Sequence, residues 1–304
     1  MSLEAESSRP TSGPSAVREL GWRTNGKPIS VNWHVWPWCN YRCSFCFATF
    51  RDTPQALPRQ EALLVPRLLR EAGTEKITFA GGEPTLCPHL SELLEESKDE
   101  GLVTMVVTNA SRLTDEFLDV SAPWIDWIAL SVDSGSNTIE ADLGRGFGSH
   151  VDQVRKGAQR IKARGIHLKV NTTVTAATWR EDMHALIQEL NPERWKVFQV
   201  LPIRGENDDF GPQGWISRGQ FRAFLERHTD LHPVAETNED MLGSYVMLDP
   251  LGRFFQNPDG RYAYSDAILE VGVEPALAQV GWDSHRFVVR GGLYDWNRSG
   301  RERE

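Results

Sequence analysis

The sequence predicts an α/β protein whose parallel strands curve into a partial barrel. Apolar, β-branched runs alternate with segments of helical periodicity over residues 29–201, and six strand-then-helix units in succession indicate a parallel sheet. A chain of 304 residues can bury a sizeable core, and chains of this length are often one domain when the fold is an α/β barrel. We therefore expect one barrel-like domain with appended segments.

The strands and helices of this barrel are predicted in chain order from their periodicity. Alternating or continuous apolar residues indicate strands, and apolar residues three and four apart indicate helices. The predicted strands are residues 30–35, 76–80, 103–107, 127–132, 167–174 and 195–201. The predicted helices are residues 60–71, 90–100, 114–120, 151–164 and 180–190. Thr114 is the N-cap candidate of the third helix, and Gly165 ends the fourth.

The pattern changes after residue 201. A polar stretch, residues 204–219, precedes a predicted helix at 220–227 and strand-like runs at 245–248 and 253–256. We expect residues 202–304 to form a C-terminal α/β extension that covers the open mouth of the barrel, with a charged, frayed end. Residues 1–28 are rich in Ser, Pro, Gly and Glu, and we expect a disordered lead-in there.

Composition narrows the class of function. Lys plus Arg total 33 against 42 Asp plus Glu, a formal net charge of -9, which argues against a binder of nucleic-acid polymers. A small polyanionic substrate would need a local cluster of cations instead. The chain has no apolar run of membrane-spanning length, no signal peptide and no amphipathic N-terminal anchor. Together with few cysteines, this predicts a soluble, cytoplasmic protein, which we expect to be a monomer.

Three of the four cysteines lie within eight residues. Cys39, Cys43 and Cys46 have the spacing Cys-x3-Cys-x2-Cys, and the fourth, Cys87, follows forty-one residues after Cys46. Clustered thiolates favour iron-sulfur clusters, zinc or cuprous ions. A four-iron cluster ordinarily takes four cysteines, so three ligands would leave one iron open. An open position is typical of catalytic metal centres.

The alternative is a structural zinc site of three cysteines completed by His34 or His89. Structural zinc sites usually pair their ligands in two short-spaced hooks. The sequence contains no second hook of this kind, so we disfavour zinc.

The cysteine motif, with Phe45 just before the last cysteine and Gly81-Gly82-Glu83-Pro84 downstream, resembles the radical S-adenosylmethionine (SAM) superfamily. The resemblance implies that the three cysteines hold a 4Fe-4S cluster and that the amino and carboxylate groups of SAM chelate the fourth iron. It also implies a partial (β/α)6 TIM-like barrel, with the Gly-Gly-Glu-Pro segment along the methionine end of SAM.

A narrower resemblance runs from about residue 27 to residue 296. The segments 30–35, 190–199, 205–207, 224–228, 244–249, 266–274 and 290–292 together are similar to viperin and its microbial relatives. Those proteins are nucleotide dehydratases, which convert a ribonucleoside triphosphate to its 3'-deoxy-3',4'-didehydro form, an antiviral chain terminator. In the implied reaction a 5'-deoxyadenosyl radical abstracts the hydrogen atom at C4', and the 3'-hydroxyl leaves as water. UTP and CTP are the expected substrates, and the sequence does not decide between them.

The resemblance and the barrel architecture assign the cofactor residues. Working residues of such barrels lie at the C-terminal ends of the strands. For SAM the resemblance implies Gly81, Gly82 and Glu83, then Asn109 toward its ribose, and Ser131 and Arg145 toward its carboxylate. Glycine is required at 81 and 82 if the backbone closely approaches the cofactor.

The nucleotide residues are predicted from strand periodicity and from the resemblance together. Lys169 with Asn171, and Arg194 with Lys196, share strand faces by the two-residue period, and with Lys76 they form a cationic cluster for a triphosphate. By resemblance, Asn32 and His34 face the nucleotide, Arg290 lies in a loop that closes over the phosphates, and Tyr245 lies near the ribose. We expect His34 and Tyr245 to be catalytic, Tyr245 as a donor to the departing hydroxyl.

Two other readings stay open from the sequence alone. One is a radical SAM enzyme of another class, such as a peptide-maturing enzyme, although those commonly carry further cysteines for auxiliary clusters. The other is a scaffold whose metal is structural. The leading reading also implies two partners: an electron donor of the ferredoxin or flavodoxin type, and the iron-sulfur assembly machinery.

Overall fold

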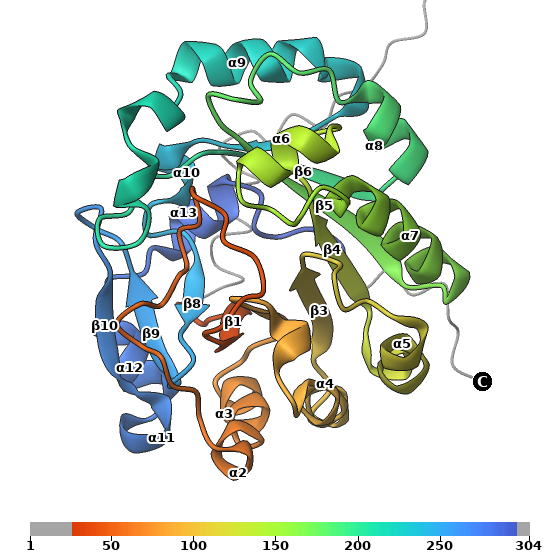
Figure 1. Cartoon of the computed structure of the whole chain (residues 1–304). Helices are drawn as coiled ribbons and strands as arrows, with labels where there is room; N and C mark the ends of the chain where they lie inside the picture. The colour runs from red at the N-terminus through yellow and green to blue at the C-terminus, as the bar shows by residue number, and fades with distance from the viewer. Residues whose placement is uncertain (1–25, 297–304) are drawn as a thin grey trace, which may run out of the picture.

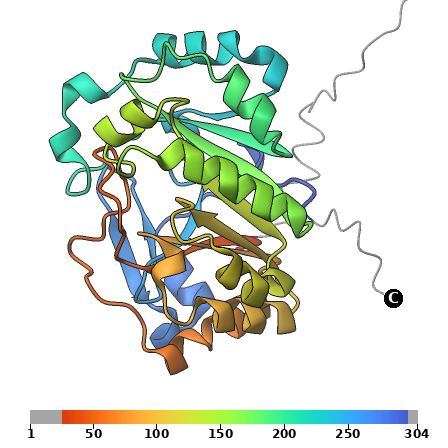
Figure 2. The same ribbon diagram turned by 45° about the vertical axis from the view of Figure 1, so that its right-hand side comes forward.

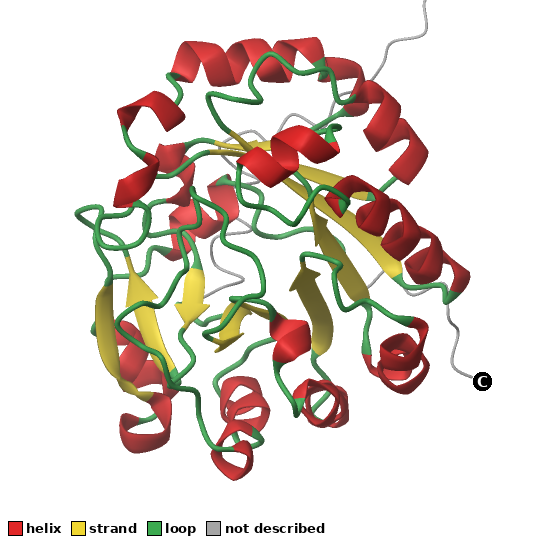
Figure 3. Ribbon diagram, in the orientation of Figure 1, coloured by secondary structure: helices red, strands yellow, loops and turns green. Residues whose placement is uncertain are grey.

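The computed structural model describes residues 26–296, in which helices surround a curved sheet (Figure 3). The strands are β1 (Ser30–Trp36), β2 (Lys76–Gly81), β3 (Val103–Thr108), β4 (Trp127–Ser131), β5 (His167–Val174), β6 (Arg194–Gln199), β7 (Val234–Glu236), β8 (Val246–Leu248), β9 (Arg253–Gln256) and β10 (Ala263–Ala267). The helices are α2 (Arg59–Ala62), α3 (Val65–Glu71), α4 (Leu90–Asp99), α5 (Asp115–Ser121), α6 (Asn137–Asp142), α7 (His150–Ala163), α8 (His184–Leu190), α9 (Arg218–Arg227), α10 (Asn238–Met241), α11 (Ile268–Val271), α12 (Val273–Ala278) and α13 (Ser284–Val289).

All ten strands belong to one sheet, in the order β10-β9-β8-β1-β2-β3-β4-β5-β6-β7. Each neighbouring pair from β1 to β7 is parallel, and β8 is parallel to β1. Strand β9 is antiparallel to both of its neighbours, β8 and β10. Within the described residues β7 and β10 are the two edges, so the barrel is open. The predicted α/β partial barrel is confirmed, with helices α3, α4, α5, α7 and α8 on the outer side of the sheet (Figure 1).

Alternation along the strands separates the core from the interior of the barrel. On β1, Val31 and Trp33 are fully buried in the main hydrophobic core, whereas Asn32 and His34 line the interior. Strands β2 and β5 follow the same two-residue period, with polar side chains toward the interior, whereas β3 presents Met105 and Val107 there. Figure 2 shows α7 lying across the outer face of the sheet at β5.

Three of the elements predicted for the barrel differ from the observed ones by more than one residue. The single helix predicted at 60–71 is wrong, because the chain forms α2 and α3 in its place, and Pro66 lies in the first turn of α3, where proline is tolerated. The helix predicted from 180 begins at His184. Before it, the carbonyls of Trp179 and Glu181 accept hydrogen bonds from the Arg227 guanidinium instead of from helical amides. Strand β6 ends at Gln199, two residues before its predicted end.

The C-terminal part of the chain extends both ends of the sheet. Strand β7 pairs with β6, and β8 pairs with β1. Sequence periodicity missed β7 and β10 because neither contains a run of large apolar residues: they read Val-Ala-Glu and Ala-Tyr-Ser-Asp-Ala. The predictions for residues 1–25 and 298–304 lie outside the described residues. In the part of the chain that is described, no helix has both the length and the apolar character that crossing a bilayer demands.

The loop that follows β1 is held on two sides by backbone hydrogen bonds. On one side, the amides of Gly82 and Glu83 donate to the carbonyls of Trp36 and Trp38, at 2.7 and 2.8 Å. A Cβ on Gly82 would lie 2.3 Å from the Trp38 carbonyl oxygen. Glycine is therefore required here because the strand end packs directly against the cysteine loop.

On the other side, the loop packs against the segment after α6. The amides of Arg42 and Ser44 donate to the carbonyls of Gly144 and Leu143, at 3.0 and 2.9 Å. Gly144 has φ +80°, and a Cβ there would lie 2.1 Å from the Arg42 carbonyl oxygen. The cysteine loop is thus clamped between two segments that are distant in sequence.

This clamp predicts unequal effects of two glycine substitutions in one segment. Gly144→Ala and Gly148→Ala both place alanine at positive φ, which costs about 1–2 kcal/mol, but an alanine at 148 meets nothing within 4 Å. Gly144→Ala adds the backbone clash, so it should lower the unfolding temperature further and reduce the iron retained after anaerobic reconstitution. Equal iron content and equal melting temperature in the two variants would contradict the clamp.

Candidate active site

A cavity of about 300 Å³ lies inside the barrel and extends from the first residues of β1, β2 and β6 (Ser30, Lys76 and Arg194) to the cysteine loop at the C-terminal ends of the strands. Every residue predicted for the site lines it. These are Asn32, His34, Cys39, Cys43, Cys46, Lys76, Gly81, Gly82, Glu83, Asn109, Ser131, Arg145, Lys169, Asn171, Arg194, Lys196, Tyr245 and Arg290. The C-terminal part of the chain adds Met241, Met247, Asn257, Tyr262, Phe287, Gly291, Gly292 and Tyr294.

The clamped loop brings the three clustered cysteines to one end of the cavity. The amide of Tyr41 donates to Cys39 Sγ at 3.3 Å, and Asn109 Nδ2 donates to the same sulfur at 3.7 Å. Burial raises the pKa of Cys43 to about 12 and that of Cys46 to about 11. Binding to a positive metal centre offsets such a cost, since thiolates are the ligating form.

The spacing of these sulfurs bears on the zinc alternative. A tetrahedral zinc with Zn–S bonds of 2.3 Å holds its sulfurs about 3.8 Å apart. Among the described residues, Asp182, His184 and His228 are the group of Cys, His, Asp or Glu side chains that lie close enough to share a single ion, and this group contains none of the cysteines. His34, one of the two proposed fourth ligands, packs against Phe47, Phe50 and Phe255. The donor set therefore fits a multi-iron cluster better than a single ion.

Glu83 ties the Gly-Gly segment to the next strand end. Its carboxylate accepts hydrogen bonds from the Thr85 amide and hydroxyl, from Thr108 Oγ1 at 2.7 Å and from the Asn109 amide at 2.8 Å. Burial raises the pKa of Glu83, and these donors oppose that rise. Glu83 thereby orients Asn109, whose side chain reaches Asn40 and Cys39.

Arg145 reaches the cavity as part of a buried ionic network. Its Nε donates to Asp133 Oδ2 at 2.6 Å and lies 3.6 Å from Glu140. Burial and the neighbouring Asp133 raise the pKa of Glu140 to about 8, although Arg145 lowers it. Ser131 lies on the same wall, and its carbonyl is hydrogen-bonded to His150 Nε2 at 2.8 Å.

The other end of the cavity holds five cations, which we call the cationic cluster: Lys76, Lys169, Arg194, Lys196 and Arg290. Burial and the neighbouring cations lower the pKa of Lys76 to about 7, and burial lowers that of Lys169 well below its usual value. Arg194 Nε and Asn171 Oδ1 are buried without a hydrogen-bond partner among the described residues. Like charges with unsatisfied donors are costly unless an anion joins them.

Sequence reasoning missed the counter-ion of this cluster, Glu236. Its carboxylate forms ion pairs with Lys196 and with Arg290 Nη1, the latter at 2.9 Å, and it accepts the hydroxyl proton of Tyr245. Lys196 Nζ donates to Tyr245 Oη at 2.7 Å. Glu236 ends a three-residue strand, so periodicity offered no signal for it.

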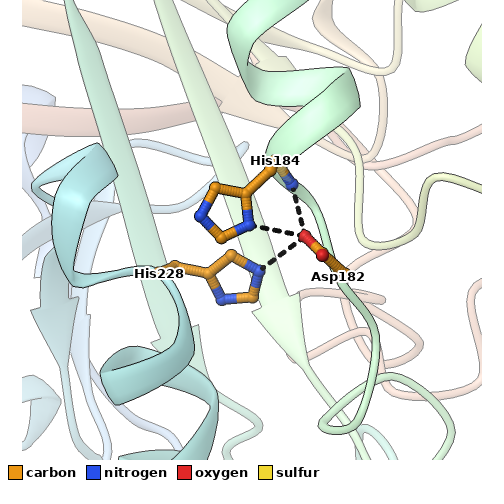
Figure 4. A group of neighbouring side chains, drawn as sticks. All are labelled: Asp182, His184 and His228. Carbon is orange, nitrogen blue, oxygen red and sulfur yellow. Dashed lines mark hydrogen bonds and ion pairs between the residues drawn. The ribbon is translucent and has the colours of Figure 1, made fainter.

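A second group of potential ligands lies outside the barrel, at Asp182, His184 and His228 (Figure 4). The Nε2 atom of His228 accepts from the Met183 amide at 2.9 Å, and its Nδ1 bonds the Phe224 carbonyl. Both ring nitrogens are therefore occupied, and His184 bridges Asp182 and Asp230. This group joins α8 to the end of α9 and holds no free metal-binding lone pair on His228.

The fold and the three-cysteine loop together define a class of enzyme. The sequence matches the radical SAM superfamily over residues 33–190. The fold is similar to that of Streptococcus suis SuiB bound to S-adenosylmethionine, with a TM-score of 0.64 and 15% identity over 91% of this chain and 74% of that one. It is also similar to Escherichia coli coproporphyrinogen III oxidase, a radical SAM enzyme, with a TM-score of 0.51 and 15% identity over 72% and 55%. The protein is a radical SAM enzyme, whose cofactors are a 4Fe-4S cluster and SAM.

Sequence relatives narrow this class. The chain is 44% identical to an S-adenosylmethionine-dependent nucleotide dehydratase of Flammeovirga pacifica, over 88% of this chain and 96% of the relative. It is 38% identical to the S-adenosylmethionine-dependent nucleotide dehydratase RSAD2 of Danio rerio, over 96% and 85%. The chain therefore belongs to the viperin-like family of SAM-dependent nucleotide dehydratases.

Substitutions of two cysteines test which thiols hold the cluster. Cys43→Ala should abolish the cluster absorbance and reduce iron well below four per chain, because a ligand is lost. Cys87 is 5% exposed and packs in the main hydrophobic core, so Cys87→Ala should retain the cluster. Equal iron loss in both variants, measured after anaerobic reconstitution, would overturn the three-ligand assignment.

Proposed function

We propose that the enzyme converts a ribonucleoside triphosphate, UTP or CTP, to its 3'-deoxy-3',4'-didehydro form. The observation that carries this proposal is the cavity itself, which has three thiols at one end and the cationic cluster at the other. The relatives named as nucleotide dehydratases support the same assignment. Because the product lacks a 3'-hydroxyl, a polymerase that incorporated it could not extend the chain, which suits an antiviral role.

The cationic cluster is the proposed triphosphate site. Five basic side chains surround one carboxylate, Glu236, and even with Lys76 and Lys169 neutral the charges of Arg194, Lys196 and Arg290 exceed that of Glu236, in a chain of net charge -9. Charge-assisted hydrogen bonds to phosphate oxygens would satisfy the unpartnered Arg194 Nε. Lys76 begins β2 and Gly81 ends it, a separation of about 17 Å along a strand. If the phosphates bind near Lys76, the ribose of the same nucleotide would lie closer to the Gly-Gly segment.

The wall formed by β1 is the proposed contact for the rest of the nucleotide. Asn32 and His34 lie on its interior face. Burial lowers the pKa of His34 to about 4, so the ring is neutral near pH 7 and offers one donor and one acceptor. Its Nδ1 is buried without a partner among the described residues, which leaves that atom available to the nucleotide.

The proposed reaction consumes two electrons and one proton for each nucleotide, and it releases methionine, 5'-deoxyadenosine and water. The bound cluster and SAM supply a 5'-deoxyadenosyl radical that takes the hydrogen atom from C4'. The residues of the cavity hold the sugar, exclude water and provide the proton on which the 3'-hydroxyl leaves. We predicted Tyr245 as the donor, but its hydroxyl donates a hydrogen bond to the Glu236 carboxylate. Lys196 Nζ donates a hydrogen bond to Tyr245 Oη, so Lys196 can resupply a proton to Tyr245.

The proposed partners follow from this electron demand. A one-electron carrier of the ferredoxin or flavodoxin type would deliver both electrons, and the iron-sulfur assembly machinery would load the cluster. We also propose that the three cysteines hold the cluster and that Gly81, Gly82, Glu83, Asn109, Ser131 and Arg145 bind SAM.

Anaerobic turnover with SAM and dithionite, in separate reactions with CTP, UTP, GTP and ATP, tests the proposed substrate. We expect CTP or UTP to stimulate 5'-deoxyadenosine formation strongly, with a nucleotide product lighter by one water, both followed by mass spectrometry. Slow SAM cleavage that no nucleotide stimulates would refute the nucleotide assignment while leaving the radical SAM chemistry intact.

Replacing a cation tests the proposed triphosphate site. Lys196→Ala should raise the KM for the nucleotide about 10- to 100-fold, because a hydrogen bond to a charged group contributes about 1.5–3 kcal/mol. Nucleotide-independent SAM cleavage should persist. The control is Lys162→Ala, an exposed lysine in the last turn of α7. An unchanged KM in Lys196→Ala would show that the phosphates bind elsewhere.

A further inference from the structure

Glu236 lies behind the wall of the cavity rather than in it. Its side chain is fully buried, and the wall in front of it includes Lys196, Tyr245 and Arg290. One carboxylate oxygen pairs with Lys196 and Arg290, and the other accepts from Tyr245. Glu236 thus contacts three residues that line the cavity, although it does not line the cavity itself.

Lys196 would otherwise face only like charges and neutral groups. The charged groups that act on it are Arg194 from its own strand, Lys76 from β2, Lys169 from β5, Arg290 from the C-cap of α13 and Glu236 from β7. Glu236 is the one carboxylate within ion-pair distance of Lys196 among the described residues. A buried ammonium without a counter-ion loses its proton rather than bear the cost of desolvation.

We propose that Glu236 is a positioning residue that keeps Lys196 protonated, so that the phosphate site is cationic before the anion arrives. The inference rests on the proposed function, because it takes a nucleoside triphosphate as the ligand. It goes further by assigning the charge state of the site to a residue that the nucleotide does not touch.

The direction of the pKa shifts agrees with this geometry. Burial lowers the pKa of Lys196 to about 8, and the attraction of Glu236 is the largest opposing cause. Burial alone would raise the pKa of Glu236, but Lys196 and Arg290 bring it to about 2. Glu236 is therefore ionised near neutral pH. Without its charge the pKa of Lys196 is lower, so a smaller fraction of Lys196 is protonated near neutral pH, and that fraction recovers as the pH falls.

Glu236 also determines which hydrogen-bonding groups face the nucleotide. The single hydroxyl proton of Tyr245 is directed to Glu236, and one ammonium proton of Lys196 is directed to Tyr245 Oη. The guanidinium of Arg290 lies 3.6 Å from the centre of the Tyr245 ring. Tyr245 therefore presents an acceptor to the cavity, and Lys196 presents a donor.

The test compares Glu236→Gln with the wild type in anion binding across pH. The probes are CTP, UTP and inorganic tripolyphosphate, titrated into the anaerobic, cluster-loaded protein with SAM, between about pH 6 and pH 8.5. At the high-pH end the variant should bind at least about 10-fold more weakly, as expected for a lost charge-assisted contact. The ratio of the two dissociation constants should return toward one as the pH falls. Taking the ratio at each pH cancels the titration of the phosphates themselves.

A structural role for Glu236 predicts a different result. If the variant is weaker by the same factor at every pH, or equal to the wild type throughout, the inference is wrong. Glu236→Asp keeps the charge and should restore the pH profile of the wild type, even if its affinity is lower; an Asp profile that matches Gln would also overturn the inference. The iron content and cluster absorbance of both variants after anaerobic reconstitution should match the wild type, which confirms that the cluster end is intact.

Tripolyphosphate separates this inference from the proposed function. It carries the anionic chemistry without a base or a sugar, so the pH-dependent effect of Glu236 should be seen with it whether or not nucleotides are substrates. Wild-type protein that binds tripolyphosphate with the expected dependence on Glu236, but turns over no nucleotide, would refute the proposed function alone. Wild-type protein that binds none of the probes would refute both.

Discussion

The structure depends on the clamp that holds the cysteine loop between Gly82 and Gly144. The loop that carries the three clustered cysteines has no regular structure of its own, so its shape must come from its neighbours. Four backbone hydrogen bonds supply that shape, two from the end of β2 and two from the segment after α6. The absence of side chains at both glycines brings these backbones within hydrogen-bonding distance. The Gly-Gly segment therefore has a structural role, which is to hold the cysteine loop, besides any contact with SAM.

Unlike the clamp, which stabilises the fold, the cationic cluster costs folding free energy. Burying five basic side chains opposes folding, because each one that stays charged loses its hydration and repels the others. One carboxylate, Glu236, offsets part of that cost. A fully neutralised cluster would be more stable but would have no remaining attraction for an anion. Burial first, and the neighbouring cations after it, lower the pKa values of Lys76, Lys169 and Lys196, and a bound anion would oppose both effects.

Much of the fold and the site could be predicted because both depend on short periods and close spacings. The two-residue period placed Lys169 with Asn171 on the interior face of β5, and the cysteine spacing located the thiol end. Glu236 could not be found in this way, since its contacts with Lys196 and Tyr245 depend on β7 joining β6 thirty-five residues after the end of that strand. The break between α2 and α3 was missed because the apolar spacing continues through it.

The two ends of the cavity are held in a fixed position relative to each other, because the same strands form both ends. Strand β2 begins at Lys76 in the cationic cluster and ends at Gly81 beside the cysteine loop, and β1 carries Asn32 and His34 between them. Parallel pairing fixes the register of these strands, and the main core on their outer face resists any shift of one residue, which would exchange polar and apolar faces. The distance between the thiols and the cations is thus fixed by backbone pairing. For the nucleotide that we propose as substrate, this fixed distance sets how far the phosphates and the reacting carbon must lie from each other.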